Sequence, residues 1–178
     1  MYALHTSVRE RKETVQESRR RFHMLVREHI LPHVDMRRVS GWVLGQHWRR
    51  ASAEQRRRFT SAFTKQLVSL LAKGFFQQNS EIKIRSIFTR GKPSNTSAQV
   101  VVEYEDEESL YEGDTFYVTY ILYKNKQSKW KIYDVKVSGF SLVLLYRGKY
   151  DWQIRQYGLE ETIKRLEKKI RKLTAKRK

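Results

Sequence analysis

The sequence predicts an α+β fold, with helices packed on a curled antiparallel sheet of four to five strands. Apolar residues follow a helical period towards both ends of the chain and alternate with a period of two over residues 81–137. No internal repeat and no Pro/Gly-rich linker divides these parts, and 178 residues suffice for one hydrophobic core. We therefore expect one domain over residues 1–178 with a core at about 20–169, and with the N-terminal helix and the basic tail 170–178 at its periphery.

The first helix is expected over residues 6–31. Ser7 and Glu10 have the spacing of a capping box, in which each side chain bonds the backbone N–H at the other position. Pro32 is expected to end this helix, because proline disfavours the helical conformation at the residue before it.

Two further helices are expected before the sheet. Asp35 can cap the second, and Gly45 stands near its end. Ser52 and Gln55 form a second capping pair at the start of the third, and Gly74 is expected to stop it. The apolar stripe of the third helix consists of Phe59, Phe63, Leu67, Leu70 and Leu71.

Four strands are expected next, over residues 81–87, 98–104, 115–123 and 130–137. The connections between the last three are polar and of hairpin length, which indicates an antiparallel meander. After these strands, Gly148 and Gly158 and an apolar pattern of period 3.6 indicate a helical C-terminal section.

The stretch SGFSLVLLY, residues 138–146, extends the last strand in this interpretation. Its four consecutive apolar residues, from Leu142 to Leu145, do not alternate with polar ones. A strand of that composition must be covered on both faces. We therefore expect protein or ligand on either side of it.

Charge and composition limit the classes of function. The chain has 37 Lys and Arg against 19 Asp and Glu, so its net charge of +18 predicts attraction to nucleic acid, anionic lipid or an acidic protein face. The absence of cysteine excludes disulfides, thiolate catalysis and Cys-ligated metals. No run approaches the roughly 18 apolar residues of a membrane span, so a soluble chain is expected, with or without a removed leader.

No catalytic or metal-binding pattern stands out. His29 and His33 have helical ligand spacing with Asp35 nearby, but Pro32 falls between the two histidines and breaks the helix that would align their rings. Neither a Ser/His/Asp arrangement nor a Gly-rich phosphate loop is present. We expect no metal, no cofactor and no enzymatic activity, although a small-molecule enzyme remains an alternative class.

Basic clusters such as ESRRRF, EQRRRF and KRLEKKIRKLTAKRK favour a second alternative, a nucleic-acid-binding or partner-binding module. Most of these charges stand opposite the apolar stripe of a helix, where they usually form a solvated face, and the strands have no aromatic-and-basic RNA-binding signature. We expect salt-dependent sticking to nucleic acid but no specific recognition of it.

Two segments resemble signatures of one family. LPHVDMRRVSGWVLGQHWRRASAEQRRRFTSAFTKQL, residues 31–67, is similar to the helical signature of the MlaC, or toluene-tolerance, phospholipid-transport family. WKIYDVKVSGFSLVLLYRGKYDWQIRQYGLEETIKRLEKK, residues 130–169, resembles its second signature, with Trp-x-x-x-Asp-Val, then Ser, then Tyr-Arg. The resemblance spans about residues 20–169, and the two signatures occur in the family's order.

This resemblance implies a monomeric periplasmic carrier that holds phospholipid as cargo by its acyl chains. It would exchange lipid between an outer-membrane lipoprotein complex and an inner-membrane ABC transporter, touching the membrane surface only transiently. It also implies a cone-shaped sheet of the nuclear-transport-factor-2 type, with an apolar cavity between sheet and helices.

We expect the cavity to be lined from both the helices and the sheet, and the charges at its mouth to attract lipid headgroups. Arg147 is the candidate for a headgroup or docking contact. The predicted lining residues are Trp48, Phe63, Leu67, Leu71, Phe116, Val118, Phe140 and Leu142.

Overall fold

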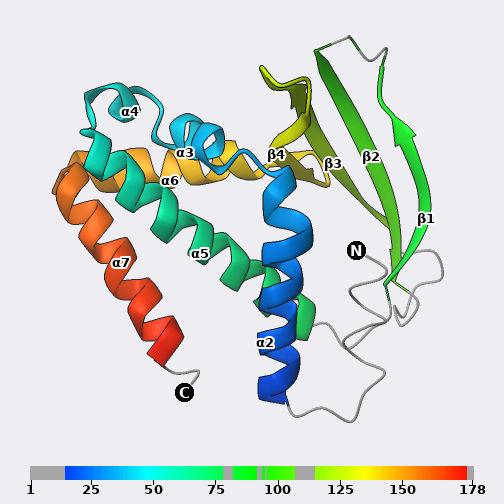
Figure 1. The fold of residues 1–178 in the computed structure, drawn as a ribbon, viewed down its shortest axis with the longest axis horizontal. Coiled ribbons are helices and arrows are strands. Elements are labelled where there is room, and N and C mark those ends of the chain that lie inside the picture. Colours follow the sequence, from blue (N-terminus) through cyan, green and yellow to red (C-terminus); the bar gives the residue numbers. More distant parts are fainter. Residues whose placement is uncertain (1–14, 78–81, 92–93, 95, 107–114, 176–178) are drawn as a thin grey trace. The chain divides into compact units, whose positions relative to one another are not determined.

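A computed structural model describes residues 15–77, 82–91, 94, 96–106 and 115–175 of the chain (Figure 1). The chain divides into two compact units, each made of two segments. The sheet unit consists of Met1–Asp35 and Ala72–Leu142, and the helical unit consists of Met36–Leu71 and Val143–Lys178. The expectation of a single domain remains a prediction.

The sheet unit contains one antiparallel sheet in the order β1-β2-β3-β4-β5, which confirms the predicted meander and the α+β class. Figure 1 shows β1 to β4 side by side in chain order. Bulges interrupt the register between Ile84 and Ser86 of β1 and opposite Ile121 and Leu122 of β3, and bulges bend the strands that contain them. The strands are β1 Ile82–Thr89, β2 Ser97–Asp106, β3 Thr115–Lys124, β4 Trp130–Val137 and β5 Phe140–Ser141.

The helix α2, Val15–Leu25, belongs to the sheet unit and continues as a π-helical turn over Val26–Ile30 and a 3-10 turn over Leu31–His33. The second half of the predicted first helix is therefore confirmed, while its capping box lies outside the described residues. The helical backbone passes Pro32 by one residue, and Val34 is extended and pairs in parallel with Ile132 of β4.

Hydrogen bonds connect the segment 32–35, which follows α2, to strands β3 and β4. The N–H of Asp35 donates to the carbonyl of Ile132 at 2.9 Å, and the carboxylate of Asp35 accepts a hydrogen bond from Tyr123 of β3. Lys131 donates to the carbonyl of Pro32. These contacts fix the residue at which α3, Met36–Leu44, begins, directly after Asp35 as predicted.

In the helical unit, α4, Gln46–Arg50, follows Gly45, and α5, Ala53–Gln77, follows Ser52. The predicted capping box is confirmed: the N–H of Ser52 donates to Gln55 Oε1 at 3.0 Å, and the N–H of Gln55 donates to Ser52 Oγ at 3.1 Å. The predicted stop at Gly74 is wrong, because α5 continues to Gln77. A glycine inside a helix costs only about 1 kcal/mol, which the long helix tolerates.

The last two helices are α6, Leu142–Tyr157, and α7, Leu159–Ala175, separated by Gly158 with φ of +76°. Residues 142–146 therefore form a helix, and the predicted strand over 138–146 is wrong except at Phe140 and Ser141. Ser138 and Gly139, with φ of 47° and 88°, form a tight turn that reverses the chain after β4. The buried face of α6 consists of Val143, Tyr146, Tyr150 and Ile154.

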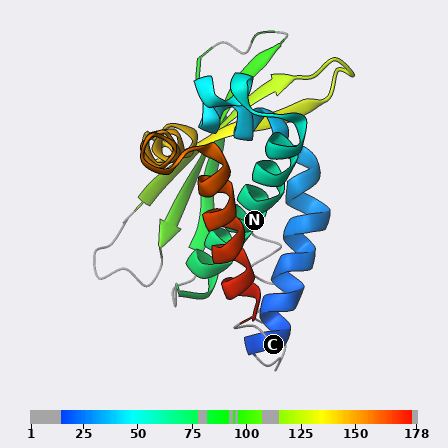
Figure 2. The ribbon, with the colours of Figure 1, turned by 90° about the vertical axis from the view of Figure 1, so that its left-hand side faces the viewer.

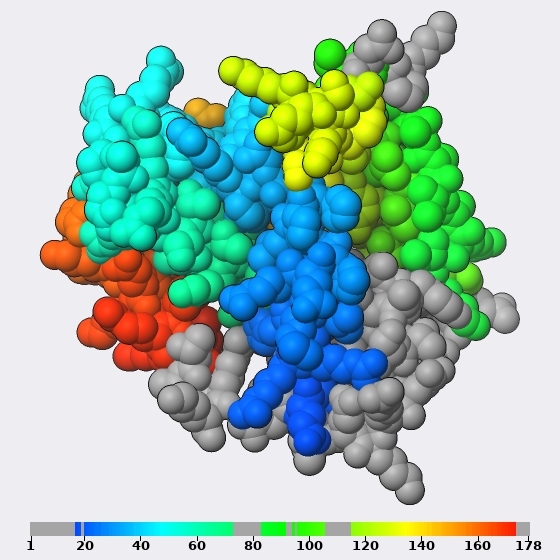
Figure 3. All heavy atoms as spheres, viewed as in Figure 1, coloured from blue at the N-terminus to red at the C-terminus, as the bar shows by residue number. Residues whose placement is uncertain are grey.

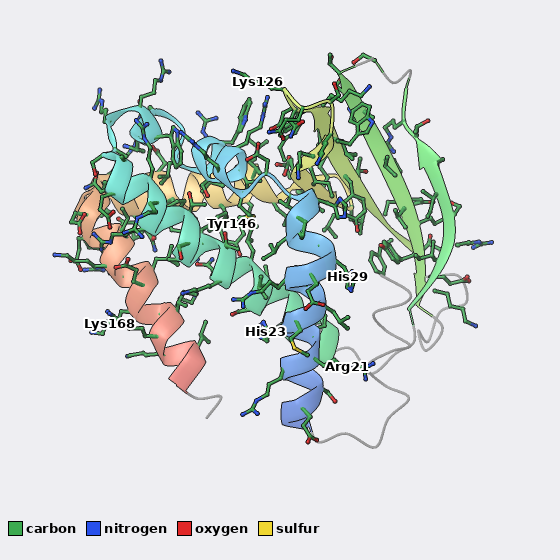
Figure 4. All side chains as sticks on the ribbon, in the orientation of Figure 1. Arg21, His23, His29, Lys126, Tyr146 and Lys168 are labelled. Carbon is green, nitrogen blue, oxygen red and sulfur yellow. The ribbon has the colours of Figure 1, made fainter. Side chains whose placement is uncertain are left out.

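An aromatic cluster joins α5 to α6. Phe59 and Phe63 stack at 5.5 Å, and Tyr150 meets Phe59 edge to face at 5.0 Å. Tyr146, labelled in Figure 4, meets Phe63 edge to face at 5.1 Å. The hydroxyl of Tyr150 donates to the buried Gln66 Oε1 at 2.9 Å, so these two polar atoms satisfy each other.

An ionic clamp joins α5 to α7. Arg58 Nη1 donates to Glu160 at 2.7 Å, while Nε and Nη2 donate to the two carboxylate oxygens of Glu167 at 2.9 and 2.7 Å. Figure 3 shows the atoms of α7 directly against those of α5. The first part of α5 is thus held to the start of α7 by a single charged hydrogen bond and to its middle by a bidentate charge pair.

Candidate functional site

One face of the sheet is apolar on all five strands. Directly opposed residues of an antiparallel sheet project to the same face, so the register decides which side chains share it. From this register the apolar face consists of Ile84, Ile87, Ala98, Val100, Val102, Tyr104, Phe116, Val118, Tyr120, Leu122, Ile132, Val135, Val137 and Phe140, with Thr89 at one edge. It ends at Lys124, whose ammonium lies 5.4 Å from the Trp130 ring.

The opposite face, which we call the mixed face, alternates polar and apolar groups. Glu103 accepts hydrogen bonds there from Ser86 at 2.6 Å and from Tyr117 at 3.2 Å. The other members of the mixed face are Lys83, Phe88, Ser97, Gln99, Val101, Glu105, Thr115, Thr119, Ile121, Tyr123, Lys131, Asp134, Lys136 and Ser141. The two faces of one sheet therefore differ sharply in chemistry.

A single row of the apolar face crosses the whole sheet, from Ile87 through Val102, Val118 and Val137 to Phe140. Val102 in the middle of the row is 7% exposed, whereas Phe140 at its end is 80% exposed. The row is thus an apolar surface that is covered at its centre and open at its edge.

Two tyrosines, Tyr104 and Tyr120, place hydroxyl groups on the apolar face. Tyr104 stacks on Phe116 with ring centroids 5.2 Å apart, and its hydroxyl lies 3.3 Å from that of Tyr120. Burial, and next the neighbouring Tyr120, raises the pKa of Tyr104 far above its ordinary value. The phenol of Tyr104 therefore stays neutral and within hydrogen-bonding distance of the Tyr120 hydroxyl.

Of the predicted lining residues, Phe116, Val118 and Phe140 lie together on the apolar face. Leu142 is the half-buried first residue of α6. The hydroxyl of Ser141 donates to Asp134 Oδ2 at 2.6 Å, and Asp134 Oδ1 accepts the N–H of Val135 at 2.8 Å. This contact holds β5 against β4 and so positions Phe140.

The other predicted lining residues belong to the helical unit. Phe63 is fully buried in the aromatic cluster, where its packing against Phe59 and two tyrosines already explains its burial. Trp48 lies under the guanidinium of Arg56, 5.4 Å from the ring centroid, while Leu67 is half-buried and Leu71 is exposed. Contact of these residues with lipid remains a prediction.

Arg147, the predicted headgroup residue, stands over Gly45. A Cβ added to Gly45 would lie 3.0 Å from Arg147 Nε, and the φ of Gly45 is +54°. The backbone conformation thus favours glycine at this position, and a Cβ there would also require the arginine side chain to shift. The two residues come from the two segments that resemble family signatures.

The sequence did not indicate the part of the apolar face that β2 contributes. Val102 and Tyr104 stand in the alternating stretch AQVVVEY, but only the register places Tyr104 opposite Phe116 and Val102 opposite Val118. The Tyr104–Tyr120 pair had no signal in the sequence, because Tyr120 lies four residues along β3 from Phe116, the residue directly opposite Tyr104.

Within the described ranges, no group of three or more His, Asp and Glu side chains could hold a metal ion. His29 and His33 are both exposed, and His29 is labelled in Figure 4. In the same part of the chain, no helix has both the length and the apolar composition needed to cross a membrane.

These features define an α+β protein whose meander sheet presents one continuous apolar face and whose helices bury aromatic and aliphatic stripes. The chain belongs to the MlaC family: the family model, described as MlaC protein, matches residues 2–168. No curated protein was found to match the sequence.

A solved structure shares the fold. It is the phospholipid-binding protein from Ralstonia solanacearum in complex with a phospholipid, which is 19% identical to this chain with a TM-score of 0.75. The match covers 96% of this chain and 92% of that one. The fold predicted from the sequence is therefore that of a solved structure over almost its whole length.

Proposed function

We propose that this protein is a phospholipid carrier that shields acyl chains against the apolar face of its sheet. The observation that carries the proposal is the apolar face itself, which crosses five strands and on which the hydroxyls of Tyr104 and Tyr120 are hydrogen-bond partners. Membership of the MlaC family and the likeness to a phospholipid-binding protein support it.

Such a carrier must compensate a large free energy of transfer, because it takes acyl chains out of a bilayer. Transfer of an acyl chain from water stabilises it by about 0.8 kcal/mol per CH₂, so two chains of common length represent on the order of 20 kcal/mol. The carrier must offer a comparably apolar environment. Because a methylene chain has no hydrogen-bonding group, contacts of this kind are non-directional, and weak selectivity for the headgroup follows.

The cellular role belongs to the same proposal. A binding and transport protein, not an enzyme, is the class that the family supports. We expect a periplasmic monomer that passes lipid between an outer-membrane lipoprotein complex and an inner-membrane ABC transporter. Arg147 and the helical residues Trp48, Leu67 and Leu71 are proposed to contact the bound lipid, Arg147 at its headgroup.

Mass spectrometry of an organic extract tests the carrier directly. Gently purified protein is expected to release phospholipid in roughly stoichiometric amount. An extract without phospholipid would count against the proposal. Nucleic acid that is released by salt, with no lipid in the extract, would instead support a basic nucleic-acid-binding module.

A matched pair of variants tests the apolar face. Phe140→Asp places a charge on this face, and Phe88→Asp places the same charge on the mixed face. Phe140 is 80% exposed and Phe88 is 44% exposed, so neither change removes a buried side chain. We expect Phe140→Asp to lose most of its co-purified lipid and Phe88→Asp to keep it. Equal lipid content in the two folded variants would place the lipid elsewhere.

A further inference from the structure

The helix α6 has a second apolar face that its own unit does not bury. Leu144, Leu145 and Trp152 are 62%, 66% and 57% exposed, on the side opposite the aromatic cluster. At about 100° per residue they fall within an arc of roughly 100°. Figure 2 views α6 end-on, at the rim of the helical unit and with α5 and α7 to one side.

Cations flank this arc. Lys149 and Arg155 lie within or beside it, and both are exposed. The nearest carboxylate on the helix, Asp151, is bonded by His47 at 2.8 Å and by Arg155 at 2.9 Å, so its charge is compensated. We call Leu144, Leu145, Trp152, Lys149 and Arg155 together the α6 outer face.

The rest of the helical unit adds charge of the same sign. Its two segments contain 20 Lys and Arg against 5 Asp and Glu, so +15 of the chain's +18 belongs to this unit. Part of this charge forms an exposed row on α7 at Lys164, Lys168 and Lys172, and Lys168 is labelled in Figure 4. Such a field attracts an extended anionic surface over about one Debye length.

We propose that the α6 outer face seats the protein on an anionic phospholipid bilayer. Leu144, Leu145 and Trp152 enter the boundary between headgroups and acyl chains, while the exposed Lys149 pairs with a lipid phosphate. A helix with an apolar stripe flanked by cations lies in the plane of a membrane interface, and tryptophan is enriched there.

The charge favours a bilayer over an acidic protein groove as the occupant. The excess of cations is spread over the whole unit, and a surface of lipid headgroups is the anionic partner of matching extent. Three apolar side chains give only weak and reversible binding, which suits a protein that must leave the membrane again. The inference concerns a surface and does not require that the sheet hold lipid.

Vesicle flotation tests the proposal with the full chain. Wild-type protein is expected to float with vesicles of phosphatidylglycerol and not with vesicles of phosphatidylcholine. The double variant Leu145→Ser, Trp152→Ser is expected to bind at least about tenfold more weakly, because it loses the two largest apolar contacts. The control is Trp42→Ser, which removes a 47% exposed indole from α3 and is expected to bind as wild type does.

Two results would overturn the proposal: equal vesicle binding by the double variant and the control, or no binding of wild-type protein to anionic vesicles. Binding of the wild-type protein to a protein partner, without binding to anionic vesicles, would also overturn the proposal. Lipid co-purification separates this proposal from the carrier function, since the double variant is expected to keep its phospholipid. If wild-type protein co-purifies with lipid but does not bind vesicles, the proposed membrane contact of the α6 outer face is refuted and the proposed carrier function is not.

Discussion

The clamp between α5 and α7 yields a prediction whose size follows from the structure. Arg58→Met keeps an unbranched apolar stem but removes three charge-assisted hydrogen bonds of 2.7 to 2.9 Å to Glu160 and Glu167. The change also leaves two carboxylates near one another, and each raises the pKa of the other when the arginine is gone.

The three side chains of the clamp are partly exposed, between 25% and 42%, so solvent screens the charges. Removal of one partner from a fully buried ion pair would lower the free energy of unfolding by more, and removal from an isolated surface pair would lower it by less than about 1 kcal/mol. For this bidentate, half-screened geometry we expect a loss of roughly 1–2 kcal/mol in the free energy of unfolding. In a chain of this size that corresponds to a fall in Tm of about 3–6 °C.

The effect should depend on pH with a defined sign. Hydrogen bonds from Arg58 lower the pKa of Glu160 and of Glu167 below the ordinary value of 4.5. Carboxylates with a lowered pKa stabilise the folded state fully above their unfolded pKa, and this contribution is lost as pH falls through the folded pKa. The stability difference between wild type and Arg58→Met is therefore full at neutral pH and shrinks below about pH 4.5.

Urea unfolding at neutral pH and near pH 3 measures both predictions. Glu167→Gln closes a double-mutant cycle with Arg58→Met, and the coupling energy reports the clamp itself. A stability difference that is the same at both pH values would refute the assignment of the effect to ionised carboxylates. A coupling energy near zero would refute the clamp.

Two other contacts give further predictions. Tyr150→Phe should cost about 1–3 kcal/mol in urea unfolding, because it leaves the buried Gln66 carbonyl without its hydrogen-bond donor. Gly45→Ala should cost about 1–3 kcal/mol through its φ of +54°, and adding Arg147→Ala should recover only the part due to the close approach. Full recovery in that double variant would show that the backbone is not strained.

Local sequence signals predicted the parts of the fold that depend on a few neighbouring residues. The capping box at Ser52 and Gln55 needs residues only three positions apart, and it forms as expected. The four long strands follow from alternation, which each segment shows without reference to the rest of the chain. Their meander order follows from short connections that leave no room for a crossover.

The wrong prediction of a strand over residues 138–146 also has a local cause. Four consecutive apolar residues cover every side of a short helix and both faces of a strand, so periodicity cannot decide between them. The deciding pattern lies further on, where Val143, Tyr146, Tyr150 and Ile154 repeat every three or four residues and form the buried face of α6. Leu144 and Leu145 then point outward, and the stretch needs cover on one side only.

The apolar face could be predicted from the sequence only in part, for a different reason. Alternation placed Phe116 and Val118 of β3 on one face, but the residues that complete the face come from other strands. Their positions depend on the register, and the register depends on two bulges that no local pattern announces. Phe140 reaches the apolar face through a two-residue turn, for which Ser138 and Gly139 were the available signal.

The division into two units has a consequence for how the chain can be cut. Each unit is assembled from two stretches that are distant in sequence, and one of the junctions lies inside α5, between Leu71 and Ala72. No contiguous fragment of the gene encodes either unit, so expression of a truncated half would yield incomplete pieces of both. For the same reason a single protease nick cannot release one unit intact, and removal of residues 143–178 would take away the tyrosines that pack on Phe59 and Phe63 of α5.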